Sequence, residues 1–314
     1  MKKVGVIGSI NWDVTIYVDH IGNINERVII NKVVQSPGGS GGNVAVATCR
    51  LLKPKQVVLI GAVGKDSIGI KQREILENEG VDVSGVIMLE NVPSGQAYII
   101  VDKDGNNMLY ILRGANEMLS SKTLIDYKVE NILEDVSIMV LTNPPLDTIE
   151  YLIEKYECLR IWAPGIYATT LNMVKAEQIL KRIDILVLNE FEAKSMLGSE
   201  KPNQAYQRLK EIGAAHTLII KLGKNGAVAI NENSLIQMPG LDLKKLGLNV
   251  VNTTGCGDAF LGGFCAALAS DKDLETALKW GNLCGGLKAA KAETRGSPRI
   301  KELMDIKTKY DSII

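Results

Sequence analysis

The chain has few features that would tie it to a metal, a membrane or a nucleic acid. Its five cysteines are scattered and never form a Cys-x-x-Cys pair, which argues against a disulfide framework and a zinc site. No apolar run reaches the roughly 18 residues of a membrane span, and the opening MKKVGVIGSINWD is broken too early for a signal peptide. Because 36 basic residues balance 36 acidic ones, no overall field draws the protein to nucleic acid or an anionic membrane. We therefore expect a cytoplasmic protein that binds small molecules.

The common glycine motifs for phosphate binding are also missing. The segment GAVGKDS from Gly61 resembles a Walker A loop, but its spacing is wrong and Asp66 follows the lysine. Neither GVIGSI nor GSGGNV fits the G-x-G-x-x-G pattern of dinucleotide-binding enzymes. This absence argues against a nucleotide-binding oxidoreductase, one alternative to the function inferred below.

What is present is an alternation of short β-rich runs with longer segments of helical periodicity. KVGVIGSI, QVVLIGAV, SIMVLT, DILVLN and HTLIIKLG are such runs. Their order predicts one α/β domain over residues 1–314, with a mostly parallel central sheet flanked by helices. The segments 14–36 and 95–112 look like strand pairs outside this order, the second turning at Asp104-Gly105. We expect them to form a small β-sheet lid, whose exposed edges favour a homodimer.

The segment NTTGCGDAFLGG is the strongest candidate for chemistry. We expect a strand to end near Val251, after which Gly255 and Gly257 allow the backbone to approach a ligand closely. The amides of Gly255, Cys256 and Gly257, at the positive end of the next helix, predict an anion hole for a transferring phosphoryl group. Asp258 would repel phosphate, but it is placed to accept a proton from an attacking hydroxyl. A first-turn carboxylate that only stabilises the helix dipole is the alternative interpretation.

Five segments, in the same order, resemble the ribokinase (PfkB) family of sugar and nucleoside kinases. They are GSINWD, PGGSGGNVAVA, LNEFEA, KLGKNGA and NTTGCGDAF, and the resemblance runs from about residue 4 to about residue 298. It implies a ribokinase-like fold and ATP-dependent phosphotransfer to a hydroxymethyl group of a sugar or nucleoside. Asp258 stands at the position of the family's general base. A non-catalytic regulator on the same fold is a further alternative, but it would not need Asp258, Asn189 and Glu192 together.

On the acceptor side, the resemblance implies that an Asn-x-Asp pair and the glycine segment hold the sugar. The matching residues are Asn11, Asp13, Gly39, Gly42 and Asn43. Asn143 falls near a family position for substrate contact, and Arg113 leaves a lid strand within reach of substrate or phosphate. Turn chemistry at a strand end is the alternative for the Asn-x-Asp pair, and an exposed surface position is the alternative for Arg113.

On the nucleotide side, LNEFEA matches an Asn-x-x-Glu pattern in which Asn189 and Glu192 organise Mg²⁺ and phosphate oxygens through water. KLGKNG resembles the family's nucleotide loop and also suits a β-hairpin turn. The resemblance implies that glycines in this loop permit close packing, that its lysine meets a phosphate, and that an asparagine in KWGNLCGG lies near the adenine. The residues concerned are Lys221, Gly223, Gly226 and Asn282.

Three residues depart from the family pattern. Asn252 replaces an aspartate that helps to bind a monovalent cation, so potassium activation is not carried over. Ser40 stands where ribokinases have lysine. Trp12 is larger than the residue usual at its position, and it is either a stacking surface for the substrate or a buried packing residue. These two changes favour a nucleoside or a modified sugar over ribose. The identity of the acceptor, the choice of ATP or ADP as donor, and the oligomeric state stay open.

Overall fold

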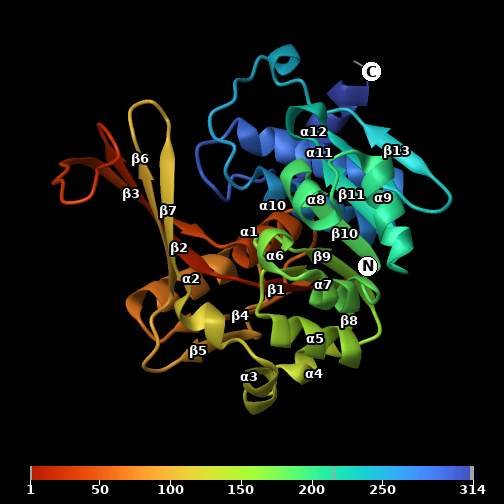
Figure 1. Ribbon diagram of the computed structural model, residues 1–314, viewed down its shortest axis with the longest axis horizontal. Coiled ribbons are helices and arrows are strands. Elements are labelled where there is room, and N and C mark those ends of the chain that lie inside the picture. Colours follow the sequence, from red (N-terminus) through yellow and green to blue (C-terminus); the bar gives the residue numbers. More distant parts are fainter. Residues whose placement is uncertain (1, 215, 312–314) are drawn as a thin grey trace.

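The computed structural model describes residues 2–214 and 216–311, and in this part of the chain it contains two β-sheets. The larger sheet is flanked by helices, and the smaller sheet projects away from it (Figure 1). Strands of the larger sheet are β1 (Lys3–Gly8), β4 (Val57–Gly64), β5 (Val86–Leu89), β8 (Val136–Thr142), β9 (Leu159–Ala163), β10 (Ile185–Asn189), β11 (Thr217–Lys221), β12 (Ala227–Ile230) and β13 (Leu235–Met238).

The strand order of the larger sheet is β13-β12-β11-β10-β9-β8-β1-β4-β5. All neighbouring pairs are parallel except β11-β12 and β12-β13, which are antiparallel at one edge. The five predicted β-rich runs are β1, β4, β8, β10 and β11, so the expected mostly parallel sheet is confirmed. The predicted runs do not include β5, β9, β12 or β13.

Helices cover both faces of the larger sheet and bury two apolar cores. They are α1 (Ser40–Cys49), α2 (Ser67–Asn78), α3 (Ser121–Asp126), α4 (Glu130–Leu133), α5 (Leu146–Lys155), α6 (Tyr167–Thr170), α7 (Met173–Leu180), α8 (Glu190–Leu197), α9 (Pro202–Glu211), α10 (Cys256–Ala269), α11 (Leu274–Ala289) and α12 (Ile300–Asp311). In β1, Val4 and Val6 join the core under α1, α10 and α11, whereas Ile7 joins the core under α5, α7 and α8. This period of two is what a sheet buried on both faces requires. Among the described residues, no helix is both long and apolar enough to cross a membrane.

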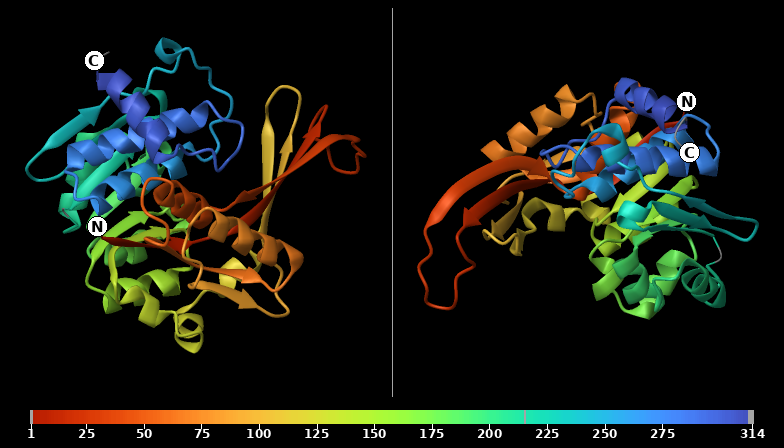
Figure 2. Two further views of the ribbon diagram at one scale, coloured as in Figure 1. Left: turned by 180° about the vertical axis from the view of Figure 1, so that it is seen from behind. Right: turned by 90° about the horizontal axis from the view of Figure 1, so that it is seen from above.

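The smaller sheet is the expected lid, and it contains four strands in the part of the chain described. They are β2 (Asn11–Val18), β3 (Ile30–Gly38), β6 (Gly95–Val101) and β7 (Asn107–Leu112), in the order β3-β2-β6-β7. β2 and β6 pair in parallel, and the other pairs are antiparallel. The predicted hairpin at Asp104-Gly105 is present, with Gly105 at φ +84°. Figure 2 shows the lid strands extending beyond the helices.

The first lid segment begins earlier than expected, at Asn11 and not at residue 14. The Asn-x-Asp pair is therefore part of β2, where Asn11 and Asp13 pair with Gly38 and Ser36 of β3. The alternative that these two residues belong to a turn is thus wrong. Strand alternation instead puts both side chains on one face of the lid sheet.

The small residues of α10 allow that helix to pack tightly between two others. A Cβ on Gly262 would overlap the side chain of Ala47 in α1, and a Cβ on Gly263 would lie 2.7 Å from the sulfur of Cys284 in α11. Close helix packing of this kind needs glycine at the contact. These contacts fix the position of the helix that carries Asp258.

Candidate active site

The predicted site residues gather at the carboxyl ends of the parallel strands. After β1 the chain continues to β4 on one side of β1, and it later returns to β8 on the other side. A switch of this kind opens a crevice where ligands bind in α/β proteins. Asn143 follows β8, and Asn189 of β10 pairs in register with Lys221 of β11.

The N-terminus of α10 lies between two cavities. The smaller cavity, of about 400 Å³, is lined by Thr254, Gly255 and Asp258. The larger cavity, of about 720 Å³, is lined by Cys256 and Gly257 from the same turn. A single helical turn thus borders two spaces that can hold two different molecules.

The backbone before α10 is a loop, so the strand expected to end near Val251 is absent. The amides of Val251 and Asn252 both donate to the carbonyl of Ala289, at 2.7 and 3.1 Å. These bonds tie the segment to the end of α11 and not to a sheet. Gly255 then caps α10 with φ +83°, and a Cβ there would lie only 2.5 Å from the carbonyl of Thr294. Both facts require glycine at this position.

Most residues predicted to hold the acceptor line the smaller cavity. They are Asn11, Asp13, Gly39, Asn43, Arg113 and Asn143. Ala97, Ile99, Leu109 and Ile111 add a wall from β6 and β7, so the lid segment 95–112 borders the space that Asp13 and Asn43 line. None of the described residues that line this cavity falls within the segment 14–36. Gly42 is not among the residues that line this cavity. A Cβ there would overlap the guanidinium of Arg295, so glycine at this position leaves room for that arginine.

Asp258 is held by hydrogen bonds from the glycine segment. Asn43 Nδ2 donates to its Oδ2 at 2.8 Å, while Asn43 Oδ1 accepts from Arg295 Nε at 3.0 Å. Burial raises the pKa of Asp258, against the lowering effects of the Asn43 hydrogen bond, the charges of Lys221 and Arg295, and a hydrogen bond from Ser40. The carboxyl group therefore binds a proton more readily than an exposed aspartate does.

In the described part of the chain, the smaller cavity holds a buried amide oxygen without a partner and a buried carboxyl group. Asn143 adopts φ +55°, and within the described residues its buried Oδ1 has no hydrogen-bond partner. Asp13 is only 8% exposed, and burial raises its pKa to about 6 despite the opposing charge of Arg295. Buried polar groups of this kind are usually satisfied by a ligand or water. Hydroxyl groups of a sugar could donate hydrogen bonds to the amide oxygen of Asn143 and to the carboxyl group of Asp13.

The residues predicted to hold the nucleotide line the larger cavity. Lys221, Gly223, Gly226 and Asn282 all contribute to it. The β11-β12 pairing confirms a hairpin at KLGKNG, and a Cβ on Gly226 would overlap the carbonyl of Met238. Asn282 Nδ2 donates to the same carbonyl at 3.0 Å. The side-chain nitrogen Nζ of Lys221 lies 3.2 Å from the position that a Cβ on Gly257 would take. This charge is therefore beside the predicted anion hole.

Asn189 and Glu192 form the N-terminal capping box of α8 and line neither cavity. Asn189 Oδ1 accepts from the amide of Glu192 at 2.8 Å, and Glu192 Oε2 accepts from the amide of Asn189 at 2.9 Å. Nowhere in the described residues do three His, Cys, Asp or Glu side chains gather as a metal site. Mg²⁺ that keeps its waters and binds mainly to phosphates fits this arrangement, because it needs few protein ligands.

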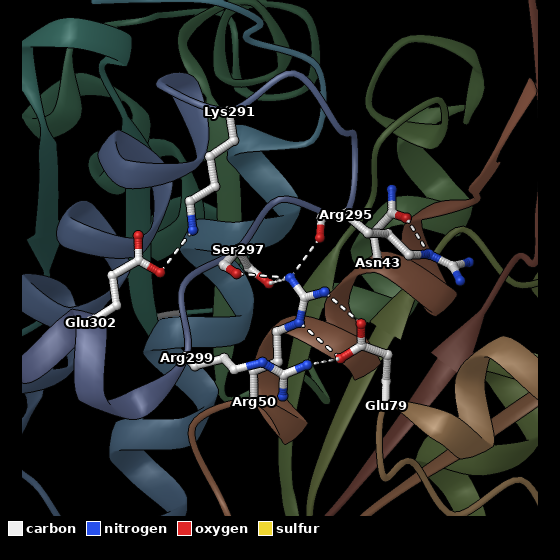
Figure 3. A network of polar contacts seen from close by, with 8 residues as sticks. All are labelled: Asn43, Arg50, Glu79, Lys291, Arg295, Ser297, Arg299 and Glu302. Atoms are coloured by element: carbon white, nitrogen blue, oxygen red, sulfur yellow. Dashed lines mark hydrogen bonds and ion pairs between the residues drawn. The ribbon is translucent and has the colours of Figure 1, made fainter. Parts of the chain in front are cut away.

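Arg295 was missed by the sequence interpretation, although it links several parts of the site. Besides Asn43, it donates from Nη2 to the carbonyl of Gly38 at 2.7 Å. Its segment is fixed by Arg50, which donates to the carbonyls of Arg295 and Ser297 and pairs with Glu79 (Figure 3). In the sequence, the one sign of this arginine's role is that it stands among the polar and turn-forming residues of TRGSP.

Trp12 takes no part in the smaller cavity. It is 6% exposed, its Nε1 donates to Gln35 Oε1 at 3.1 Å, and Lys71 lies over its ring at 5.0 Å. Neighbouring positions of a strand face opposite sides, so Asn11 and Asp13 face the cavity while Trp12 packs behind it. The packing interpretation of Trp12 therefore fits the structure.

Two cavities that meet at the amides of one helix terminus suit an enzyme that transfers an anionic group between two bound molecules. Comparison with known proteins gives the family. Residues 1–301 match the pfkB family carbohydrate kinase model. The chain is 30% identical to an ATP-dependent ribose-1-phosphate kinase of Halopiger xanaduensis, over 95% of each chain. It is 29% identical to a ribokinase of Staphylococcus aureus, over 97% of this chain and 99% of the relative.

A solved structure agrees with these relatives. The crystal structure of ribokinase from Thermotoga maritima superposes with a TM-score of 0.87 at 28% identity, over 98% of this chain and 100% of the other. The chain therefore belongs to the pfkB family of carbohydrate kinases. It is an ATP-dependent kinase of a sugar or nucleoside, with the ribokinase-like fold that the sequence motifs predict.

Proposed function

We propose that the protein transfers the γ-phosphoryl group of ATP to a hydroxymethyl group of an acceptor bound in the smaller cavity. The observation that carries this proposal is the position of the α10 N-terminus between the two cavities, with Asp258 lining the smaller one. ATP would occupy the larger cavity, whose volume of about 720 Å³ suits a nucleotide. The acceptor would lie under the lid.

Asp258 is the proposed general base. It takes the proton of the acceptor hydroxyl while the oxygen attacks the γ-phosphorus and the bond to the β-phosphate oxygen breaks. The pKa of Asp258 is raised by burial, and the opposing hydrogen bond from Asn43 keeps it from rising further. A carboxylate with a raised pKa is a stronger proton acceptor than an ordinary one.

The amides of Gly255, Cys256 and Gly257 are the proposed anion hole. Charge on the transferring phosphoryl group grows next to these N–H groups and the positive end of α10, and the amides need no reorganisation. Lys221 adds a positive charge from the larger cavity. Mg²⁺, when bound, would neutralise charge on the phosphate oxygens. Asn189 and Glu192 lie outside both cavities at the N-terminus of α8, so they would reach this ion only through its waters.

The proposed acceptor is a nucleoside or a substituted sugar and not free ribose. Ser40 borders the cavity where a lysine was expected for ribose, and it hydrogen-bonds Asp258. Arg113 lies exposed at the cavity wall, where its guanidinium suits an anionic substituent. The Halopiger relative, by its name, acts on a phosphorylated ribose, which agrees with this choice.

Asp258→Asn tests the proposed base. The variant should fold normally and lose roughly 10²- to 10⁴-fold in kcat, because an amide cannot accept the proton. Glu190→Gln is the matched control, since Glu190 is an exposed first-turn carboxylate of α8. ATP consumption would be measured with ribose, ribose 1-phosphate, adenosine, cytidine and inosine as acceptors. Full activity of Asp258→Asn would mean that Asp258 only stabilises the dipole of α10. Ribose as the best acceptor would refute the proposed substrate class.

A further inference from the structure

Lys288 carries a buried positive charge that the proposed phosphoryl transfer does not use. It stands in the last turn of α11 and is 0% exposed. Its Nζ donates to the carbonyl of Asn252 at 2.8 Å and to the carbonyl of Lys291 at 3.2 Å. Both acceptors are backbone oxygens, and they come from two segments that are far apart in the sequence.

Keeping an ammonium group in this place has a cost. A buried charge is unfavourable unless polar groups surround it, and burial lowers the pKa of Lys288. The surroundings offset part of that cost, because carbonyl oxygens carry partial negative charge and the C-terminal end of α11 adds to it. Carbonyl oxygens that converge on one positive charge are also the surroundings that a bound monovalent cation requires.

The segment held by this ammonium leads directly to the anion hole. Asn252 begins the loop Asn252–Thr254, which ends at Gly255, the N-cap of α10. The side chain of Asn252 also bridges the loop, since Nδ2 donates to the carbonyl of Ala292 at 2.7 Å and Oδ1 accepts from the amide of Thr254 at 2.9 Å. The orientation of the anion-hole amides therefore depends on the carbonyls that Lys288 holds.

We propose that the ammonium of Lys288 is a built-in monovalent cation that fixes the Asn252–Thr254 loop, so that the anion hole forms without potassium. Lys288 is a positioning residue, because it acts on the transferring group only through the loop. Without its charge, the carbonyls of Asn252 and Lys291 lose their common partner and the loop relaxes. The consequence for catalysis rests on the proposed role of the Gly255–Gly257 amides.

Lys288→Ala tests this inference, because it removes the charge and opens space for an ion. The parent should show equal kcat in potassium, ammonium and tetramethylammonium chloride at one ionic strength. Lys288→Ala should lose at least about tenfold in kcat in tetramethylammonium, less than the roughly 10²–10³-fold cost of losing a whole donor. Potassium or ammonium should restore most of it, and KM for ATP should change less than kcat.

Two further variants separate the effect from simple damage. Lys288→Met fills the space and excludes an ion, so its kcat should stay low in all three salts. Lys291→Ala is the matched control, because its Nζ pairs with Glu302 at 2.7 Å while its carbonyl remains in place. It should behave like the parent. A loss in Lys288→Ala that neither ion restores would show a merely structural lysine and overturn the proposal. A Lys288→Ala variant that keeps the kcat of the parent in tetramethylammonium would overturn it as well.

Thermal unfolding gives a readout that does not depend on turnover. The Tm of Lys288→Ala should rise in potassium or ammonium relative to tetramethylammonium, whereas the Tm of the parent should not. If the parent proved inactive in every salt while this Tm pattern held, the proposed function would fail and the cation role would stand. Strong activation of the parent by potassium would overturn the inference even where a variant fails to fold.

Discussion

Asp13 is the residue at which stability and acceptor binding should conflict most clearly. Its carboxyl group lies under the lid, 8% exposed, and burial raises its pKa from 3.8 to about 6. The charge of Arg295 lowers the pKa, and the charge of Asp258 raises it further. The folded protein therefore holds a carboxylate that would be more stable in water, in the cavity proposed for the acceptor, whose hydroxyl groups can donate to it.

The free-energy cost of this carboxylate follows from the shift in its pKa. Roughly two pKa units correspond to about 3 kcal/mol of unfolding free energy, and the attraction to Arg295 is already included. A pKa that is higher in the folded state means that folding takes up a proton between pH 4 and 6. The cost is thus absent below about pH 4, grows between pH 4 and 6, and is complete above pH 6.

Asp13→Asn should accordingly be more stable than the parent by up to about 3 kcal/mol at pH 7.5, and equal to it near pH 4. The same variant should lose roughly 10- to 100-fold in kcat/KM for the acceptor, because a hydrogen bond to a charged group contributes about 1.5–3 kcal/mol. Urea unfolding at pH 4, 5 and 7.5 measures the first effect. Asp104→Asn, at the exposed lid turn, is the control. A variant that is less stable than the parent at every pH would refute the reasoning.

Two further predictions concern the loop before α10 and the lid. Gly255→Ala should lower the free energy of unfolding by more than about 2 kcal/mol and lose most activity. Its Cβ would lie 2.5 Å from the carbonyl oxygen of Thr294, and the alanine would have to adopt a positive φ. Gly247→Ala has the same strain at φ +70° in open space, so equal effects in chemical denaturation and kcat would contradict this account. Tyr110→Glu, on the exposed apolar lid strand β7, should turn a lid-paired dimer into a monomer in sedimentation velocity, whereas Leu235→Glu on β13 should not. A parent that sediments as a monomer would refute lid pairing.

Much of the fold could be predicted because it rests on local patterns. Runs such as VVLIGAVG are apolar on both faces, as strands buried in a parallel sheet must be, and the helical segments between them identify the crossovers. The run LRIWA of β9 is short and contains Arg160, so it gives little signal. The apolar residues before Val251 predict a strand that the described structure does not have, because the amides of Val251 and Asn252 bond to the carbonyl of Ala289 at the end of α11 and not to a strand. Pairing partners of this kind cannot be derived from a single segment.

The candidate site was predictable where glycines and polar residues stand together in the sequence, and not where folding alone brings them together. Asn43 and Asp258 are 215 positions apart, and Arg295 is 252 positions from Asn43. Arg295 and Lys288 look like ordinary surface residues in the sequence, since basic side chains are rarely buried. Their role becomes visible only once the structure buries them next to the glycine segment and the loop.

The two interpretations of Asp258 are compatible, because one helix terminus stabilises negative charge in both. The positive end of α10 favours the carboxylate of Asp258 in the first turn, and it would equally favour charge on a phosphoryl group at the proposed anion hole. Burial acts against the carboxylate, whereas Asn43 and Ser40 favour it through hydrogen bonds. A base that is too well stabilised would accept no proton, and one that is too poorly stabilised would already hold one at neutral pH. Burial raises the pKa of Asp258 and the hydrogen bonds from Asn43 and Ser40 oppose that rise, so Asp258 is a better proton acceptor than an exposed aspartate, as the proposed general base requires.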